Sequence, residues 1–225
     1  IIFIDKITLK RYFADLNLID MTIFELAPSV VDVLPKFRYK DIRSEMSEQV
    51  IEKFLSPAPI VIQPCLMHML GIPAAGKSTY YQEHKDEFPP HVFVGFDTIM
   101  EALPLYQKDL EKHGSVYAFR RWELPARVIG YELLERAIAA KKNIFFDHGG
   151  TPTAHAELLR NIKVLGYRTE MIYIKCDVDV AQKRAIEREK KTYRHTPPQI
   201  IIDRAKLTEE LVPVYKEIVD EFIEV

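Results

Sequence analysis

The sequence predicts an α/β fold: an open parallel β-sheet with helices on both faces, preceded by an N-terminal helical extension. Two observations predict it. From Pro59 onward, short apolar runs alternate with segments of helical periodicity, the arrangement of parallel strands joined by helical crossovers. In addition, residues 71–79 fill every fixed position of the pattern G-x-x-x-x-G-K-[ST], between an apolar run and a helical segment. Strand, glycine loop and helix in this order are typical of a P-loop NTPase or kinase domain.

The individual elements follow from local patterns. A helix that begins at Lys77 ends at Phe88, because Pro89 and Pro90 cannot continue it. A later helix is followed by Gly166, where a left-handed cap residue belongs. Strands are expected at residues 65–70, 91–96, 143–147 and 170–176. Helices are expected at 77–88, 126–141, 153–165, 178–191 and 198–211.

The first 58 residues differ from the rest, since they contain no glycine and no catalytic pattern. Residues 22–34 and 39–55 have helical periodicity. We therefore expect residues 1–58 to form a helical extension packed on the core, with a partner-binding surface as the alternative. We expect residues 59–225 to form a P-loop kinase domain, with a lid around 178–198.

Composition excludes several classes of function. The chain has 225 residues, 48% hydrophobic and 28% charged, which is an ordinary globular mixture. The net charge of −2 gives no basic field to attract nucleic acid. No apolar run is as long as a membrane span, and the two cysteines lack metal-ligand spacing. We therefore expect a cytoplasmic protein without membrane or nucleic-acid partners. Because the sequence begins with Ile1 rather than methionine, we also expect it to be a piece of a longer chain, and a targeting segment could have been removed from it.

The glycine loop predicts ATP and Mg²⁺ as ligands. Its backbone N–H groups can cradle phosphates, Lys77 can reach the β- and γ-phosphates, and the Ser78 hydroxyl can bind Mg²⁺. The next helix begins with its positive dipole end toward the same anion. The expected nucleotide-binding residues are Gly71, Ala74, Ala75, Gly76, Lys77, Ser78 and Thr79.

Acidic residues close two of the predicted strands, at the sheet edge where ligands of open α/β folds bind. Asp97 follows the second strand and can act as the general base toward an acceptor hydroxyl. Its alternative role is N-cap of a helix that opens at Thr98. Asp147 closes the third strand and is a candidate Mg²⁺ ligand opposite Ser78. His148 is expected to be a structural histidine, and the two following glycines permit either close ligand approach or a turn.

Three arginines after the last predicted strand are candidates for stabilising the transferring phosphoryl group. Arg184 and Arg188 share one helix face, and Arg194 follows in a polar stretch. The alternative is a solvated face in which Lys183, Glu187 and Lys191 pair at helical spacing.

Several short motifs together resemble the zeta toxin family of P-loop kinases. They are the glycine loop, the strand ending in Asp97, and Pro104-Leu105-Tyr106. Further along are the strand closing in Asp147 with a glycine turn to Thr151, Gly166-Tyr167, and the Arg-rich helix before Arg194-His195-Thr196-Pro197. The resemblance covers roughly residues 40–205.

The resemblance implies phosphorylation of a sugar-nucleotide hydroxyl, with UDP-N-acetylglucosamine as the best-known acceptor; relatives that act as bacterial effectors phosphorylate NAD. By position, Lys77 and Ser78 match the ATP and Mg²⁺ residues and Asp97 matches the general base. Arg188 and Arg194 match the lid arginines, with Arg184 a substitute for either. The candidate substrate contacts are Asp97, Thr151 and one acid of the preceding helix, Glu123 or Glu132.

Two positions depart from the family pattern. Ala74-Ala75 stands where relatives carry Pro-Gly-Ala-Gly-like small residues, and Asp147 stands where glutamate is common. An inhibitory antitoxin is an implied partner, and the host cytoplasm is an implied location if the protein is a secreted effector. Two other functions stay open: a polynucleotide kinase, and a non-catalytic nucleotide-binding interaction module.

Overall fold

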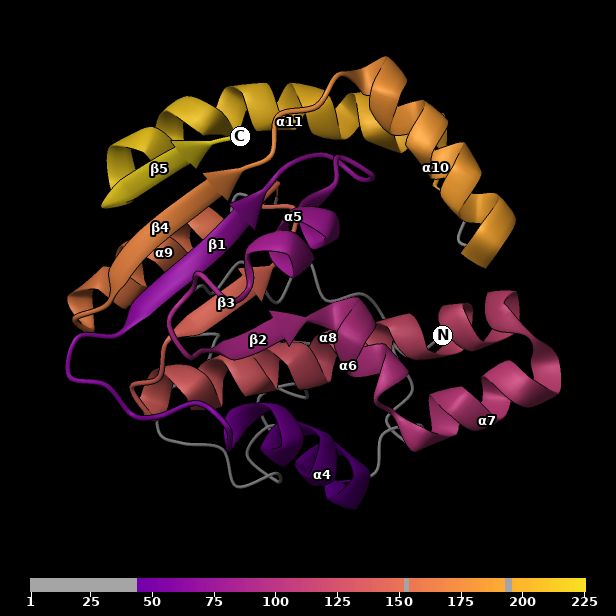
Figure 1. The fold of residues 1–225 in the computed structure, drawn as a ribbon, viewed down its shortest axis with the longest axis horizontal. Helices are drawn as coiled ribbons and strands as arrows, with labels where there is room; N and C mark the ends of the chain where they lie inside the picture. Colours follow the sequence, from indigo (N-terminus) through magenta and orange to yellow (C-terminus); the bar gives the residue numbers. More distant parts are fainter. Residues whose placement is uncertain (1–43, 152–153, 193–195) are drawn as a thin grey trace.

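The computed structural model describes residues 44–151, 154–192 and 196–225. Its centre is a five-stranded parallel sheet in the order β2-β3-β1-β4-β5 (Figure 1). The strands are β1 (Cys65–Leu70), β2 (Val92–Gly95), β3 (Ile144–Asp147), β4 (Arg168–Tyr173) and β5 (Glu221–Glu224). The predicted open parallel sheet is thus confirmed, with β1, the strand before the glycine loop, at its centre.

Helices cover both faces of the sheet, as predicted. In chain order they are α4 (Ser44–Leu55), α5 (Lys77–His84), α6 (Phe96–Glu101), α7 (Pro104–His113), α8 (Ser115–Ala139), α9 (Ala154–Val164), α10 (Val178–Thr192) and α11 (Pro198–Ile218). Alternate residues of β1 point to opposite faces. Leu66 and Leu70 belong to the core beneath α8 and α9, while Met67 and Met69 belong to the core beneath α5 and α10.

The helix α4 packs on α8 and so joins the N-terminal region to the sheet (Figure 1). Met46, Val50 and Ile51 of α4 are buried in the same core as α8. On its polar side, Glu48 makes two hydrogen bonds with Arg136 of α8, one of them 2.8 Å long. Only the end of the helix expected at 39–55 is described, and the helix expected at 22–34 lies outside the described residues, so the proposed boundary at residue 58 stays a prediction.

Several predicted bounds were wrong. The strand expected at 91–96 ends at Gly95, because Phe96 already begins α6. The helix expected at 126–141 begins much earlier, at Ser115, and carries Pro125 in its interior. Pro125 removes one backbone hydrogen bond and so is a typical helix-start signal, but here its ring is buried in the core. The sequence interpretation also missed α7 and β5, and it considered α6 only as the alternative helix opening at Thr98. It began the fourth strand two residues too late, since β4 begins at Arg168.

No helix in the described ranges is both long enough and apolar enough to cross a bilayer.

Candidate active site

The glycine loop joins β1 to α5 at the carboxyl edge of the sheet. Gly76 has a φ of 110° and Ala74 a φ of 62°, both in the left-handed region. Left-handed residues within such a loop turn successive N–H groups toward one concavity, which binds anions. The ammonium of Lys77 lies over this loop, because Nζ donates to the carbonyl oxygens of Gly71 at 2.9 Å and Ile72 at 3.0 Å. The left-handed backbone of Ala74 costs about 1–2 kcal/mol, whereas glycine adopts this conformation without strain.

Ser78 and Asp147 meet across the loop. The Ser78 hydroxyl donates to Oδ2 of Asp147 over 3.4 Å. Asp147 is the last residue of β3, which pairs in parallel with β1. A hydroxyl and a carboxylate side by side are ligands that suit a hard divalent cation such as Mg²⁺. The two residues therefore fit the metal that the sequence implied.

Asp97 lies at the same edge, one strand further out. Gly95 pairs with Asp147 in the β2–β3 register, so the chain reaches Asp97 just beyond that pair. Asp97 sits in the first turn of α6 and is exposed. The N-cap of α6 is Gly95, not Asp97, and makes no side-chain cap bond. The alternative in which Asp97 caps a helix opening at Thr98 is therefore wrong, since the helix begins at Phe96.

One of the three predicted lid arginines lies beside the loop. Arg184 donates from Nη1 to the carbonyl oxygen of Ala75 at 2.8 Å, which places its guanidinium against the phosphate cradle. Arg188, one turn later on α10, donates to the Thr196 hydroxyl at 2.6 Å and so joins α10 to the segment before α11. Arg194 lies outside the described residues. The closing motion of a lid at 178–198 stays a prediction.

Residues 148–151 directly follow Asp147, and we call them the Asp147 loop. Three hydrogen bonds hold this loop in place. The N–H of Gly71 donates to the carbonyl oxygen of Gly149 at 3.3 Å and joins this loop to the glycine loop. Tyr215 of α11 donates its hydroxyl to the carbonyl oxygen of Gly150. Arg204, also of α11, donates to the hydroxyl of buried Thr151 at 2.8 Å. Thr151 thus faces α11. Arg204 and Tyr215 carried no sequence signal, because only the folded chain brings α11 to this loop.

A chain of buried hydrogen bonds runs behind the site. Nδ1 of His68 lies 2.7 Å from the carbonyl oxygen of Met69, so this nitrogen carries the proton. Its Nε2 then accepts from Nδ1 of His155 at 2.8 Å, and Nε2 of His155 accepts from the Tyr131 hydroxyl at 3.2 Å. Burial lowers the pKa of His68 to about 4 and that of His155 well below its usual value. Both rings are therefore neutral at pH 7.

His148 packs against this buried cluster, as expected for a structural histidine. Its Nδ1 accepts the N–H of Gly150 at 3.2 Å, and its ring centroid lies 4.4 Å from that of His155. Burial first, and then the neighbouring His68 and the cations Arg127 and Lys77, hold the pKa of His148 well below its usual value. Across the described ranges, no three His, Cys, Asp or Glu side chains are placed to hold a metal ion.

The two candidate acids of α8 have different surroundings. Glu132 is buried and accepts from Arg136 at 2.6 Å, and burial raises its pKa to about 7. Glu123, which lies nearer the start of α8, is partly exposed and pairs with Arg127 at 2.7 Å. The guanidinium of Arg127 lies over the ring of Phe96, and that ring lies 5.5 Å from the ring of His148, so the Glu123–Arg127 pair lies near the Asp147 loop. Of the two, Glu123 is the more exposed, and the choice of the substrate contact stays a prediction.

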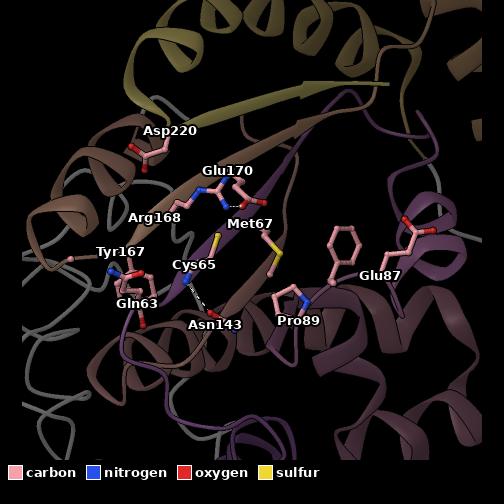
Figure 2. A pocket seen from close by; sticks show the side chains of 12 residues that line it. Gln63, Cys65, Met67, Glu87, Pro89, Asn143, Tyr167, Arg168, Glu170 and Asp220 are labelled. Carbon is pink, nitrogen blue, oxygen red and sulfur yellow. Dashed lines mark hydrogen bonds and ion pairs between the residues drawn. The ribbon is translucent and has the colours of Figure 1, made fainter.

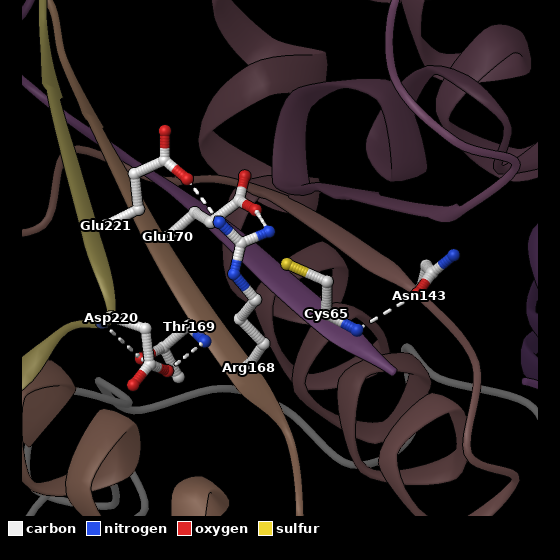
Figure 3. Close-up of polar contacts among 7 residues, drawn as sticks. All are labelled: Cys65, Asn143, Arg168, Thr169, Glu170, Asp220 and Glu221. Carbon is white, nitrogen blue, oxygen red and sulfur yellow. Dashed lines mark hydrogen bonds and ion pairs between the residues drawn. The ribbon is translucent and has the colours of Figure 1, made fainter. Parts of the chain in front are cut away.

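A cavity of about 930 Å³ lies at the opposite, amino-terminal edge of β1 and β4 (Figure 2). Figure 3 shows that Arg168 at its wall is held by Glu170, at 2.6 Å, and by Glu221. Burial raises the pKa of the Cys65 thiol there to about 12, so this sulfur is not a reactive thiolate. Its charges are internally compensated, and it is remote from the glycine loop.

The fold and the site define a P-loop nucleotide-binding domain with a kinase-like arrangement of strands. The chain matches the model of the AAA domain family over residues 66–210, and it belongs to that family. No curated protein matches the chain.

Two solved structures resemble the fold. One comes from the PezAT chromosomal toxin–antitoxin system of Streptococcus pneumoniae, with a TM-score of 0.65, 14% identity, and coverage of 84% of this chain and 79% of that one. Another, a candidate kinase from Chloroflexus aurantiacus, has a TM-score of 0.46 and 18% identity over 73% of this chain and 86% of that one. The toxin–antitoxin neighbour confirms, at the level of the fold, the resemblance that the sequence indicated.

Proposed function

We propose that the protein is an ATP-dependent phosphotransferase that phosphorylates a hydroxyl of a small metabolite. One observation carries this proposal: three neighbouring strands, β1, β3 and β2, deliver the glycine loop, Asp147 and Asp97 to one edge of the sheet. P-loop pumps and switches need the first two of these groups. A phosphotransferase acting on a hydroxyl also needs a base beside them, and Asp97 supplies it.

In the proposed reaction, the acceptor oxygen attacks the γ-phosphorus of ATP and the bond between that phosphorus and the β–γ bridging oxygen breaks. Asp97 takes the proton of the acceptor hydroxyl, and ADP leaves. Lys77 and Arg184 lie against the loop and neutralise charge on the transferring group. Arg188 and Arg194 are proposed to assist from the lid. When bound, Mg²⁺ would be held by Ser78 and Asp147 and would neutralise charge on the phosphates.

The resemblance to zeta toxins suggests the acceptor. We propose a sugar nucleotide such as UDP-N-acetylglucosamine, or a dinucleotide such as NAD, with Thr151 and Glu123 among its contacts. An antitoxin is proposed as a partner, because the fold resembles a structure from a toxin–antitoxin system. The cytoplasm of the producing cell, or of a host cell, is the proposed location.

The test is to incubate the protein with ATP, Mg²⁺ and a metabolite extract and to search by mass spectrometry for species heavier by one phosphate. UDP-N-acetylglucosamine and NAD are tested separately as purified acceptors. The Lys77→Ala variant serves as the control that should form no product. If no metabolite gains a phosphate while ATP still binds, the non-catalytic interaction module becomes the better account.

A polynucleotide kinase is the competing enzyme. Asp97 would serve a 5′-hydroxyl equally well, but the net charge of −2 provides no basic surface for a nucleic-acid backbone. Incubating the protein with labelled ATP and with DNA or RNA 5′ ends distinguishes the polynucleotide kinase from the small-metabolite kinase. Transfer to those ends, rather than to the metabolite pool, would replace the proposed acceptor class.

A further inference from the structure

Cationic side chains from three helices converge on the Asp147 loop. Lys77 begins α5, Arg127 lies in the middle of α8, and Arg204 lies on α11. Lys77 donates to Gly71, whose own N–H is bonded to Gly149, and Arg204 donates to Thr151. Arg127 lies over the ring of Phe96, 6.0 Å from its centroid, and that ring lies 5.5 Å from the ring of His148. Lys77 holds the glycine loop and Arg127 pairs with Glu123. Arg204 has only its bond to Thr151 to account for its presence here.

The arginines of this protein have two kinds of partner. Arg136 is held by Glu48 and Glu132, and Arg168 by Glu170 and Glu221. Arg204 donates to the neutral hydroxyl of Thr151, just as Arg188, a candidate phosphate-binding residue, donates to that of Thr196. Among the residues that the structure describes, no carboxylate lies within ion-pairing distance of it. Its positive charge is therefore not balanced by the described part of the protein, although the side chain is half-buried.

The geometry of this pair suits an anion. A guanidinium has five N–H donors in a fixed planar fork, and the bond to Thr151 uses one of them. Because Thr151 accepts that bond with its oxygen, its own hydroxyl hydrogen is not consumed by it and can donate to a ligand. Donors from a guanidinium and a hydroxyl, side by side, match the oxygens of a phosphate.

A purely mechanical role for Arg204 is already filled. Tyr215, on the same helix, anchors α11 to the same loop through the carbonyl oxygen of Gly150. A second anchor would not need a charge, and a half-buried charge costs free energy unless it has a partner. The uncompensated guanidinium is better explained by a ligand that supplies the negative charge.

We propose that Arg204 and Thr151 form a phosphate subsite beside the glycine loop, on the side of the Asp147 loop. This proposal rests on the proposed function, because the bound phosphate belongs to the donor or the acceptor of that reaction. The bound group is either the γ-phosphoryl of the donor or a phosphate carried by the acceptor. Both have the same chemistry, so the experiment must separate them.

The experiment measures binding by titration calorimetry in the full chain. Variant Arg204→Met removes the charge and keeps the length, and Arg204→Lys keeps the charge but loses the fork. Arg160→Met, which removes an exposed arginine of α9, is the matched control for loss of a charge. Tyr215→Phe removes the other bond from α11 to the loop and tests the anchoring role. Circular dichroism and urea midpoints confirm that each variant is folded.

Two arms separate the sources. In the first, affinities for Mg-ATP and Mg-ADP are compared; a γ-phosphoryl contact predicts that Arg204→Met weakens ATP binding about tenfold or more and leaves ADP binding within twofold. In the second, inorganic phosphate is titrated into protein saturated with Mg²⁺ and a non-hydrolysable ATP analogue. An acceptor-side contact predicts that phosphate binds to the wild type and loses about tenfold or more in affinity in Arg204→Met. In either arm Arg204→Lys should retain more affinity than Arg204→Met.

The proposal is overturned if Arg204→Met stays within twofold of wild type in both arms, or if Tyr215→Phe causes the same loss as Arg204→Met. Failure of the proposed function looks different: no metabolite gains a phosphate, while the two binding arms still report on Arg204 as long as the wild type binds nucleotide. A further case is a wild type that does not bind nucleotide. In that case inorganic phosphate is titrated into the nucleotide-free protein. A loss specific to Arg204→Met still supports the subsite, and no binding to the wild type overturns it.

Discussion

The hydroxyl of Ser78 and the carboxylate of Asp147 lie 3.4 Å apart, although 69 residues separate them along the chain. Their meeting depends on the strand order, since β3 pairs directly with β1 and brings its last residue beside the start of α5. The carboxylate is one methylene shorter than the glutamate that the family commonly has, and it still reaches the serine. The departure noted in the sequence therefore does not separate this carboxylate from the glycine loop.

Removing either member of this pair should weaken nucleotide binding only when Mg²⁺ is present. For Ser78→Ala and Asp147→Asn we expect the Mg²⁺ concentration for half-maximal ATP binding to rise on the order of tenfold. Binding measured in the presence of a chelator should change little. Ser56→Ala, at the exposed end of α4, is the control. An equal loss with and without Mg²⁺ would show that the pair serves the loop's structure rather than a metal.

Gly71 should tolerate no side chain. A Cβ at this position would lie 2.8 Å from the carbonyl oxygen of Ile174, a backbone atom that cannot move aside cheaply. Gly166 has a φ of 85°, and a Cβ there would meet nothing within 4 Å. Gly166→Ala should therefore lower the free energy of unfolding by about 1 kcal/mol, for its left-handed backbone alone. Gly71→Ala should cost about 2–3 kcal/mol. Urea titrations of both variants test the difference; equal losses would contradict it.

The buried histidines should make the fold sensitive to acid. The pKa of His68 is lowered to about 4, below its value of about 6.5 in the unfolded chain. The unfolded chain therefore takes up protons first, and stability should fall by about 3 kcal/mol as the pH drops from 6.5 to 4 for this ring alone. His148 and His155 act in the same sense.

The measurement is the free energy of unfolding in urea between pH 7.5 and pH 4.5. Glu132 acts in the opposite sense, because its pKa is raised to about 7 and its contribution is lost as the pH rises through that value. The wild-type curve alone therefore does not isolate the histidines, and two variants are compared with it. His155→Phe should flatten the pH dependence, while His113→Gln, at an exposed helix end, should leave it unchanged. A wild-type curve that runs parallel to that of His155→Phe would contradict the assignment.

Glu123 and Glu132 should separate into an acceptor contact and a structural acid. Glu132→Gln is expected to cost about 1–3 kcal/mol of stability, because the substitution weakens a buried charged hydrogen bond to Arg136. Its rate of phosphoryl transfer should stay near that of the wild type. Glu123→Gln should leave stability nearly unchanged, since the Arg127 pair is partly exposed, and should reduce transfer. Steady-state kinetics and urea midpoints are measured on both variants. A loss of transfer in Glu132→Gln with a loss of stability in Glu123→Gln would contradict this assignment.

The sequence predicted best those parts of the fold that local patterns determine. The strand at 65–70 was placed to the residue, and the alternation of strands and helices fixed the parallel sheet. It failed where tertiary contacts override local signals. Pro125 would end a helix in isolation, but its burial against the core keeps α8 continuous. The short strand β5, with two acidic residues among four, has little strand character by itself and is held by pairing with β4.

The candidate site divides in the same way. Lys77 and Ser78 belong to a motif with fixed spacing, and Asp147 closes a predicted apolar strand, so the sequence could name all three. Arg204 and the histidine chain have no such spacing, because their contacts join elements that are distant along the chain. The sequence named His148 of the buried cluster as a structural histidine, but nothing in it paired His68 with His155.

The central claim is that Asp97 activates an acceptor hydroxyl beside the bound phosphates, and Asp97→Asn tests it most directly. The matched control is Asp179→Asn, which also removes an exposed carboxylate from the first turn of a helix. We measure Mg-ATP affinity and transfer of labelled phosphate to the acceptor in both variants. The account predicts that Asp97→Asn binds ATP within about threefold of wild type and loses on the order of 10²–10⁴-fold in transfer, while Asp179→Asn loses neither. Transfer by Asp97→Asn at a rate near that of the wild type would contradict the account.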